Sequence, residues 1–420
     1  MLCATVQTRP VYESHTSPHL AHELMQAVTE WKLERANVTI PVTTDNAPNI
    51  VNAIRDTRVF GPHVACFAHT LNLAAKKAVA LSAVSRILGM IRRVVTFFHK
   101  STTAAHVLTK KQQMLSIPEH KLIHDVPTRW NTAHDMLEWY LEQQPAIFSA
   151  LLDETVRKMH KDMAMLTDSE MKLAERLIQL LNPLKKMTTL MSSESNATSS
   201  MILPLKTRTL RSMTPDPQDC PTIREGKLAI TSDLEKRYTD PDLIDYLHRA
   251  TAVDPRFKSL PFLDGAVCDQ VFKSLITEIV EHEQQNEGMQ AGPSTEKEPP
   301  SSVSPPQKKT AMSELFGDLY TDEQHTKPFS LTIEMEISLY RAADSLHVDA
   351  DPFQWWKLNQ FKFPHLSKHA QKYLCVPGTS VSSERVFSTA GDIVNASRSR
   401  LCPENVDMLI FLQKNMKIKE

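Results

Sequence analysis

Strand-like and helix-like patterns alternate through the N-terminal part of the chain, and this alternation constrains the fold more than any other feature. β-Branched and apolar runs typical of strands occur at "LCATVQTRPVY", "NVTIPV" and "GPHVACFA". Helical periodicity separates the runs: Leu20, Leu24 and Val28 share one face of a helix, and a shorter helix covers 47–56. Another helix begins in "HTLNLAAKKAVALS". The order predicts an α/β unit over residues 1–81.

Pro41 lies inside the second predicted strand. Because proline has no backbone N–H to give to a sheet, this strand is expected at a sheet edge or next to a bulge.

The rest of the chain is predicted to be helical. From 82 to 283 the apolar residues recur with helical spacing, and prolines punctuate the pattern. Residues 284–310 are rich in proline, serine and charge without a periodic apolar face, which predicts a disordered linker. Periodic sequence resumes over 311–420, so the fold class expected is α/β plus α.

Composition places the chain among ordinary soluble globular proteins, with 420 residues, 41% hydrophobic and 23% charged residues, and a formal net charge of -1. Its six cysteines are dispersed without a C-x-x-C pair, which favours free thiols in a reducing compartment. We see no apolar run near the ~20 residues that span a bilayer, and no signal peptide.

Asp45 lies in "TTDNAPN", where a predicted strand passes into a predicted helix. Its carboxylate is suited to capping the helix, because aspartate accepts an orphan backbone N–H there, and Pro48 suits a first helical turn. A carboxylate at a strand end is also well placed to hold a divalent metal. Local turn chemistry favours the cap.

Cys66 and His69 have the C-x-x-H spacing of half a zinc site. A structural zinc ion needs four ligands, usually from two such pairs, and the sequence offers no second pair. We therefore expect a buried thiol and a histidine that opens a helix.

A stretch of 62 residues, Thr57 to Pro118, contains nine basic residues and no acidic one. In "AVSRILGMIRRVVTFFHK" an apolar stripe is opposed by Arg86, Arg93 and Lys100, spaced by seven. Such a ridge is suited to contacting backbone phosphates, and it is equally compatible with a solvated helix face.

Two further positions in the sequence each have two possible interpretations. Trp130 follows Arg129 after a proline turn, and it is interpreted first as a core anchor and second as a platform for an unpaired base. Glu384 lies in the first turn of a helix starting near Val381, where it complements the helix dipole or, alternatively, binds a metal.

These motifs together resemble the hAT superfamily of DNA transposases and the BED-type zinc-finger proteins derived from it. The resemblance runs in order through "TTDNAPNIVNAIRD", "CFAHTLNLA", "DVPTRWN", "DPRFKSLPFL", "DPFQWWKLNQFKFP" and the block from "VPGTSVSSERVFS" to "LIFLQKN".

The resemblance implies an incomplete RNase H-like core over 1–81, an all-helical insertion over 82–283, and a C-terminal helical dimerisation region over 311–420 that returns to the core. Asp45 and Glu384 match the family's second and third metal-binding acids, which hold divalent metal for strand cleavage and transfer. Cys66 and His69 match its C/D-x-x-H motif, and Arg129 and Trp130 match its Arg–Trp motif for handling DNA ends. Residues that match the dimerisation signature include Trp355, Trp356, Phe387, Leu409 and Leu412.

One departure from the family decides the functional expectation. The strand with the first acid and the preceding BED finger have no counterpart here, so we expect an N-terminally truncated form that neither cleaves DNA nor uses a cofactor. Mg²⁺ would be expected only if the first aspartate were supplied. The expected function is that of a nuclear protein acting by self-association and by DNA or chromatin association, with transcription regulation as the expected role and without a membrane or small-molecule partner. The alternatives are a piece of an active transposase and a protein scaffold without DNA contact.

Overall fold

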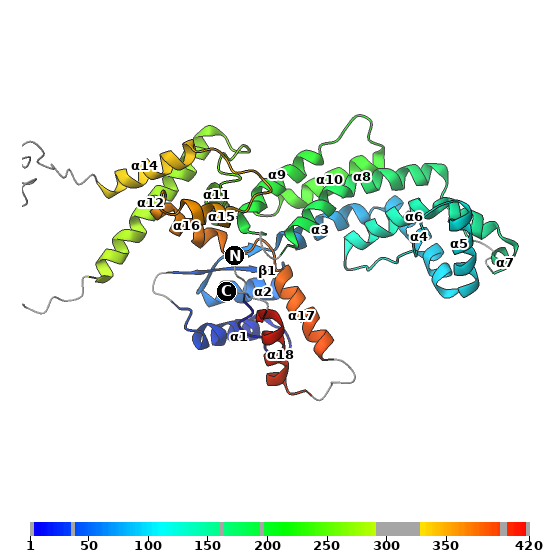
Figure 1. Ribbon diagram of the computed structural model, residues 1–420, viewed down its shortest axis with the longest axis horizontal. Coiled ribbons are helices and arrows are strands. Elements are labelled where there is room, and N and C mark those ends of the chain that lie inside the picture. The colour runs from blue at the N-terminus through cyan, green and yellow to red at the C-terminus, as the bar shows by residue number, and fades with distance from the viewer. Residues whose placement is uncertain are drawn as a thin grey trace, which may run out of the picture. The chain divides into compact units, whose positions relative to one another are not determined.

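Helices dominate the computed structural model, which describes residues 4–34, 38–159, 163–193, 197–290, 328–394 and 401–416 (Figure 1). The elements are α1 (Ser17–Glu30), β1 (Ile40–Thr44), α2 (Pro48–Thr57), β2 (Phe60–Ala65), α3 (Phe67–Val79), α4 (Ser82–Lys100), α5 (Thr102–Met114), α6 (Trp130–Leu152), α7 (Glu154–Arg157), α8 (Asp168–Met191), η1 (Ser199–Met201), α9 (Ile202–Ser212), α10 (Pro221–Glu235), α11 (Pro241–Ala252), α12 (Gly265–Gln290), α14 (Phe329–Ala342), α15 (Pro352–Asn359), α16 (Pro364–Leu374), α17 (Val381–Ile393) and α18 (Pro403–Asn415). No helix in these ranges has the length and apolarity that a membrane crossing requires.

β1 and β2 pair in parallel, and α2 connects them. The register slips beside Pro41: Ile40 faces Phe60 but Val42 faces His63, so two steps along β1 match three along β2. The irregularity at this proline confirms the sequence prediction of an edge strand or a bulge, because the missing donor costs least where the ladder is already interrupted.

The strand predicted in "LCATVQTRPVY" is wrong for the part that the structure describes, from residue 4 onward. This segment has no partner strand, and side chains of α18 take its backbone groups. The Thr5 N–H donates to Asn415 Oδ1 (3.0 Å), and the Asn415 amide donates to the Thr5 carbonyl (2.7 Å). The Thr8 N–H donates to Asp407 (2.7 Å). An alternating sequence pattern cannot predict which groups a segment will pair with.

The chain forms two compact units, residues 1–251 with 374–420, and residues 252–373. The four-part division expected from sequence therefore has different limits from the packing units. In particular, the last 47 residues (374–420) belong with the first unit.

In the first unit, the predicted apolar stripe of α4 is buried, as Val84, Ile87, Leu88, Ile91, Val95 and Phe98 are all at most 3% exposed. These side chains join one hydrophobic core with α3, α6, α8 and α10. The stripe was visible in sequence because its 3.6-residue period is that of a helix packed on one side.

The second unit is built around a cluster of aromatic rings. Tyr340 stacks on Trp356 at 5.4 Å between ring centroids, and Trp355 stacks on Phe363 at 6.0 Å. Lys258 donates from its buried ammonium to the carbonyls of Tyr340 and Ala343, at the end of α14. Lys258 thus satisfies two carbonyls at the end of α14, next to the aromatic rings that fill the core.

The linker predicted over 284–310 begins later than expected, because α12 continues to Gln290. The remainder of that linker, and the start of the periodic sequence at 311, lie outside the described residues.

Residues 376–380, where the chain returns to the first unit, lie in a narrow passage between backbone segments, with which they form hydrogen bonds. Ser199 donates its N–H to the Val376 carbonyl (2.9 Å), Gly378 donates to Ala197 (2.8 Å), and Phe67 donates to Gly378 (3.0 Å). A Cβ on Gly378 would lie 2.7 Å from the Thr198 carbonyl oxygen and 2.7 Å from a methyl of Met191. Backbone cannot move aside as a flexible side chain can, so only glycine fits.

We predict that Gly378→Ala lowers the free energy of unfolding by about 1–3 kcal/mol, the usual cost of overpacking a close contact. Gly391→Ala is the matched control, because a Cβ at this position in α17 meets no atom within 4 Å. The control should be neutral or stabilising by about 0.5–1 kcal/mol. Urea unfolding followed by circular dichroism measures both, and equal stability of the two variants would contradict the tight passage.

Candidate functional site

The carboxyl end of the β1–β2 pair brings together segments far apart in sequence. Thr44 closes β1, its carbonyl accepts the N–H of Cys66 (2.8 Å), and its hydroxyl pairs with His63 Nε2 (2.8 Å). The Thr43 hydroxyl donates to the Pro377 carbonyl (2.6 Å), which attaches the start of α17 to the same end of the sheet. Burial is the main reason that the pKa of His63 is lowered, so this imidazole is neutral near pH 7.

Asp45 and Glu384 both lie near this junction, and each has one carboxylate oxygen in a local hydrogen bond. Asp45 is not the N-cap of α2 that the sequence suggested, because the N-cap residue is Ala47. Asp45 lies two residues before it, and its Oδ1 accepts the backbone N–H of Ala47 (3.1 Å) in the turn that precedes the helix. Glu384 lies in the first turn of α17, as predicted, and it accepts from the Ser380 hydroxyl (3.2 Å). Aspartate turns and aspartate caps share one sequence signature, so the pattern alone could not separate them.

The two acids do not fit a divalent metal centre by themselves. Within the described ranges, neither belongs to a group of three histidine, cysteine or carboxylate ligands close enough to share one ion. Two-metal chemistry needs carboxylates that bridge and clamp both ions. We therefore derive no catalytic step through a metal at this junction.

Cys66 acts as a hydrogen-bond acceptor at the centre of the junction. It is fully buried and caps α3, with its Sγ accepting the N–H of His69 (3.4 Å) and that of Ser380 (3.3 Å). The Thr379 hydroxyl lies 3.4 Å from the same sulfur. The C-x-x-H spacing thus reflects a thiol that joins the first turns of α3 and α17, while His69 contributes its backbone.

Only two of the three residues of the basic ridge predicted on α4 are free of a carboxylate partner among the described residues. Arg86 pairs with Glu170 of α8 at 2.6 Å, whereas Arg93 and Lys100 are exposed and have no carboxylate within ion-pair distance among the described residues. Elsewhere on the helix, Arg92 donates two hydrogen bonds to Asp125 and lowers the pKa of that carboxyl. The acids that neutralise part of the basic stretch come from later in the sequence.

Arg129 and Trp130 have opposite environments. Arg129 is exposed and precedes α6, whereas Trp130 is 3% exposed and belongs to the hydrophobic core. The Trp130 N–H group of the backbone donates to Asn72 on α3 (3.3 Å). The ring is buried, as the core-anchor interpretation expects, although its indole N–H has no hydrogen-bond partner among the described residues. A ring buried in this way is not a stacking platform.

The aromatic pair Trp355–Trp356 lies inside the second unit. Trp356 is buried and donates its indole N–H to the Val253 carbonyl (3.0 Å), and Trp355 is half-buried against Phe363. The exposed apolar side chains nearby are Leu358 and Phe361, the latter 90% exposed, which the sequence did not single out. Burial of one aromatic residue over its neighbour depends on tertiary packing that no local pattern encodes.

The C-terminal helices α17 and α18 pack side by side (Figure 1). Val386, Ile393 and Ile410 form their shared core. The opposite face of α18 is apolar and open, with exposures of 60%, 40%, 43% and 78% for Met408, Leu409, Leu412 and Met416. At 100° per residue these four side chains span about 100° of the helix. Phe387 of α17 is 68% exposed.

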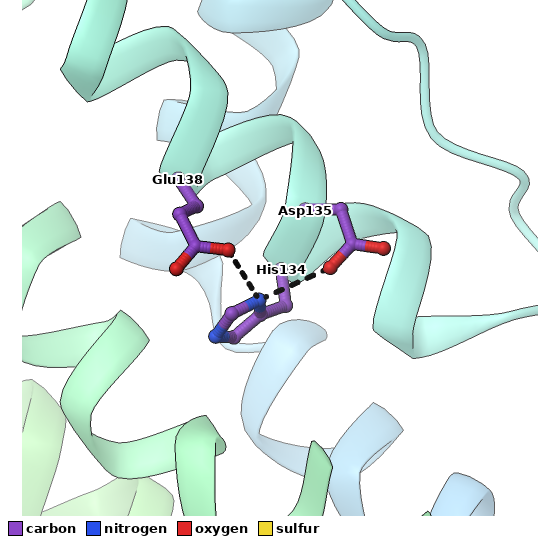
Figure 2. A group of neighbouring side chains, drawn as sticks. All are labelled: His134, Asp135 and Glu138. Carbon is purple, nitrogen blue, oxygen red and sulfur yellow. Dashed lines mark hydrogen bonds and ion pairs between the residues drawn. The ribbon is translucent and has the colours of Figure 1, made fainter. Parts of the chain in front are cut away.

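One group of titratable residues was not among the motifs identified in the sequence. His134, Asp135 and Glu138 lie together within two turns of α6 (Figure 2). Lys185 of α8 forms ion pairs with both carboxylates. Burial, and then the Lys185 charge, lower the pKa of His134, so its imidazole is neutral near pH 7. The i, i+4 spacing of His134 and Glu138 on a helix was the available signal.

Two family models match the chain. The hAT family C-terminal dimerisation region matches residues 336–416, and the ZBED1 RNase-like helical domain matches residues 64–180. The first includes the open face of α18, and the second runs from β2 into α8. The chain thus carries a region similar to the hAT dimerisation region and a region similar to the ZBED1 helical domain.

Relatives of the chain include BED-type zinc-finger proteins and a transposase. Human zinc finger BED domain-containing protein 4 is 27% identical over 381 residues, covering 89% of this chain and 31% of that protein. RICESLEEPER 3 of Oryza sativa subsp. japonica is 28% identical over 94% of this chain and 55% of its own length. A Zea mays protein described as an AC transposase is 22% identical over 94% of this chain and 50% of its own length. The chain therefore spans about a third to a half of the length of these relatives.

We predict that Cys66→Ala lowers the free energy of unfolding by about 1–3 kcal/mol, because two backbone N–H groups lose their buried acceptor. Cys402→Ala is the control, since that thiol is exposed. Thermal or urea unfolding distinguishes them. If Cys66→Ala were as stable as Cys402→Ala, the thiol would not hold the junction together.

Proposed function

We propose that this hAT-derived protein acts in the nucleus by self-association through α17 and α18 and by DNA or chromatin association through α4, with a role in transcription regulation and without strand cleavage. The observation that carries the proposal is the open apolar face of α18, which lies within the hAT dimerisation region.

Self-association is supported by the chemistry of this face. Leu409, Leu412 and Met416 are large, apolar and solvent-exposed on the side of α18 turned away from Ile410. Contiguous exposed apolar side chains of this kind mark interaction surfaces, since burying them on association is favourable. A second copy of the same helix pair is the partner that the matched region implies.

DNA association is supported by charges that remain available on α4. Arg93 and Lys100 lie two turns apart on the exposed face of this helix. Two cations about 10 Å apart along a helix can contact two separate phosphates of a nucleic-acid backbone. Arg86 is a weaker candidate than the sequence suggested, because Glu170 already pairs with it.

The absence of cleavage activity is proposed from the acids at the sheet end. Asp45 and Glu384 each have a carboxylate oxygen in a local hydrogen bond, and no third ligand joins them within the described ranges. Nucleic-acid handling then depends on binding alone.

The finer architecture is part of the same proposal. β1, α2, β2 and α3 together with α17 would be the RNase H-like core, and residues 82–283 would be its helical insertion. The attachment of residues 377–380 to Thr43 and Cys66 supports this arrangement, because it returns the chain to the sheet after a long interval of sequence.

We predict that a Leu409→Asp/Leu412→Asp double variant raises the dissociation constant of the dimer by tenfold or more, about 1.4 kcal/mol or more. Met114→Asp/Leu152→Asp is the matched control, since these exposed apolar residues lie at the ends of α5 and α6. Sedimentation equilibrium at micromolar concentration measures association. A parent chain that stays monomeric, or a double variant that dimerises like the control, would refute this surface.

We predict that Arg93→Glu/Lys100→Glu weakens binding to duplex DNA and reduces the slope of log K against log salt concentration by about 2, since each phosphate contact contributes about 0.9. Lys273→Glu/Lys357→Glu makes the same change in charge at exposed sites of α12 and α15. Fluorescence anisotropy over a salt series compares the two. Parent protein without salt-sensitive binding would favour the scaffold hypothesis instead.

A further inference from the structure

His134, Asp135 and Glu138 direct three potential metal ligands to one point on α6 (Figure 2). The His134 side chain is fully buried, while Asp135 and Glu138 side chains are 29% and 50% exposed. One side of the group is therefore held by the protein core, and the other opens to solvent.

The distances within the group are too long for good hydrogen bonds. His134 Nδ1 lies 3.4 Å from Asp135 Oδ1 and 3.9 Å from Glu138 Oε2, whereas an N–H···O hydrogen bond measures about 2.7–3.2 Å. Two ligands bound to one zinc ion at about 2.0–2.2 Å, at a tetrahedral angle, are about 3.4 Å apart. The three ligand atoms all lie within 4.8 Å of one another, which is close to the separation that ligands of one shared ion require.

A cation already occupies the carboxylate side of the group. The Lys185 ammonium, from α8, lies 2.7 Å from Asp135 Oδ1 and 3.1 Å from Glu138 Oε2. Its side chain is 33% exposed, so the ammonium can move into solvent when another cation enters. Independently of the ligand spacing, the position of this ammonium shows that the two carboxylates attract positive charge.

We propose that His134, Asp135 and Glu138 form a zinc-binding site in which Zn²⁺ replaces the Lys185 ammonium. One imidazole nitrogen and two carboxylate oxygens are ligands that zinc accepts, and the exposed side leaves a coordination position for water. The site is separate from the junction around Asp45 and Glu384, and it does not depend on the proposed function.

Metal uptake by the full-length chain tests the proposal. After treatment with a chelator, the protein is titrated with Zn²⁺ against a chromophoric zinc indicator, and with Co²⁺ while the visible absorption of the bound ion is followed. Asp135→Asn/Glu138→Gln should lose one equivalent of tight binding, with affinity reduced roughly tenfold or more. Glu142→Gln is the matched control, because this exposed carboxylate lies one turn further along α6, paired with His120, and it should bind like the parent.

Lys185→Met separates a metal site from a simple salt-bridge network. Removing the competing ammonium should tighten zinc binding several-fold and increase the rise in melting temperature that zinc produces. His134→Gln should abolish the site, and the carboxylate variants carry the test if this buried substitution prevents folding.

Two results would overturn the site. One is equal zinc uptake by the parent and Asp135→Asn/Glu138→Gln, which would place binding at other histidines and cysteines. The other is unchanged or weaker binding by Lys185→Met, which would show that the ammonium and the zinc ion do not compete.

Discussion

The passage of residues 376–380 through the first unit is the constraint on which the rest of the structure depends. At this point the chain, after a long interval of sequence, forms backbone hydrogen bonds with 197–199 and with the start of α3. Thr43 and Cys66 add contacts from the strand end and the helix cap. The helical part, the strand pair and the C-terminal helices are joined here, and the joint is dense enough to require glycine at 378. Because backbone groups buried at such a joint have no access to water, each must find a protein partner.

The sequence predicted those features that depend on one residue or on one local pattern. The helical period of α4 predicted its buried face, Pro41 predicted the irregular strand register, and the large apolar ring of Trp130 predicted its burial. Each follows from local stereochemistry or from a single apolar side chain. The family resemblance was also readable from ordered motifs, and the matched regions confirm it.

Sequence reasoning failed where the partner lies far away in the chain. The N-terminal segment was predicted to be a strand, but Asn415 and Asp407 of α18 bind its backbone in place of a partner strand. Arg86 points outward as its spacing predicts, yet Glu170, 84 positions later, neutralises it. The His134 group depends on Lys185 from another helix. Such pairings are set by tertiary structure, so periodicity and charge counts along one segment cannot reveal them.

The two faces of α18 have a geometric consequence. One side of this helix holds the N-terminal segment through Asp407 and Asn415, and another presents Leu409 and Leu412 to solvent. The segment that begins at residue 4 and the exposed leucines are therefore attached to one helix. A change that unfolds α18 would release the N-terminal segment and remove the apolar face together, so the order of the first residues of the chain depends on a helix near its end.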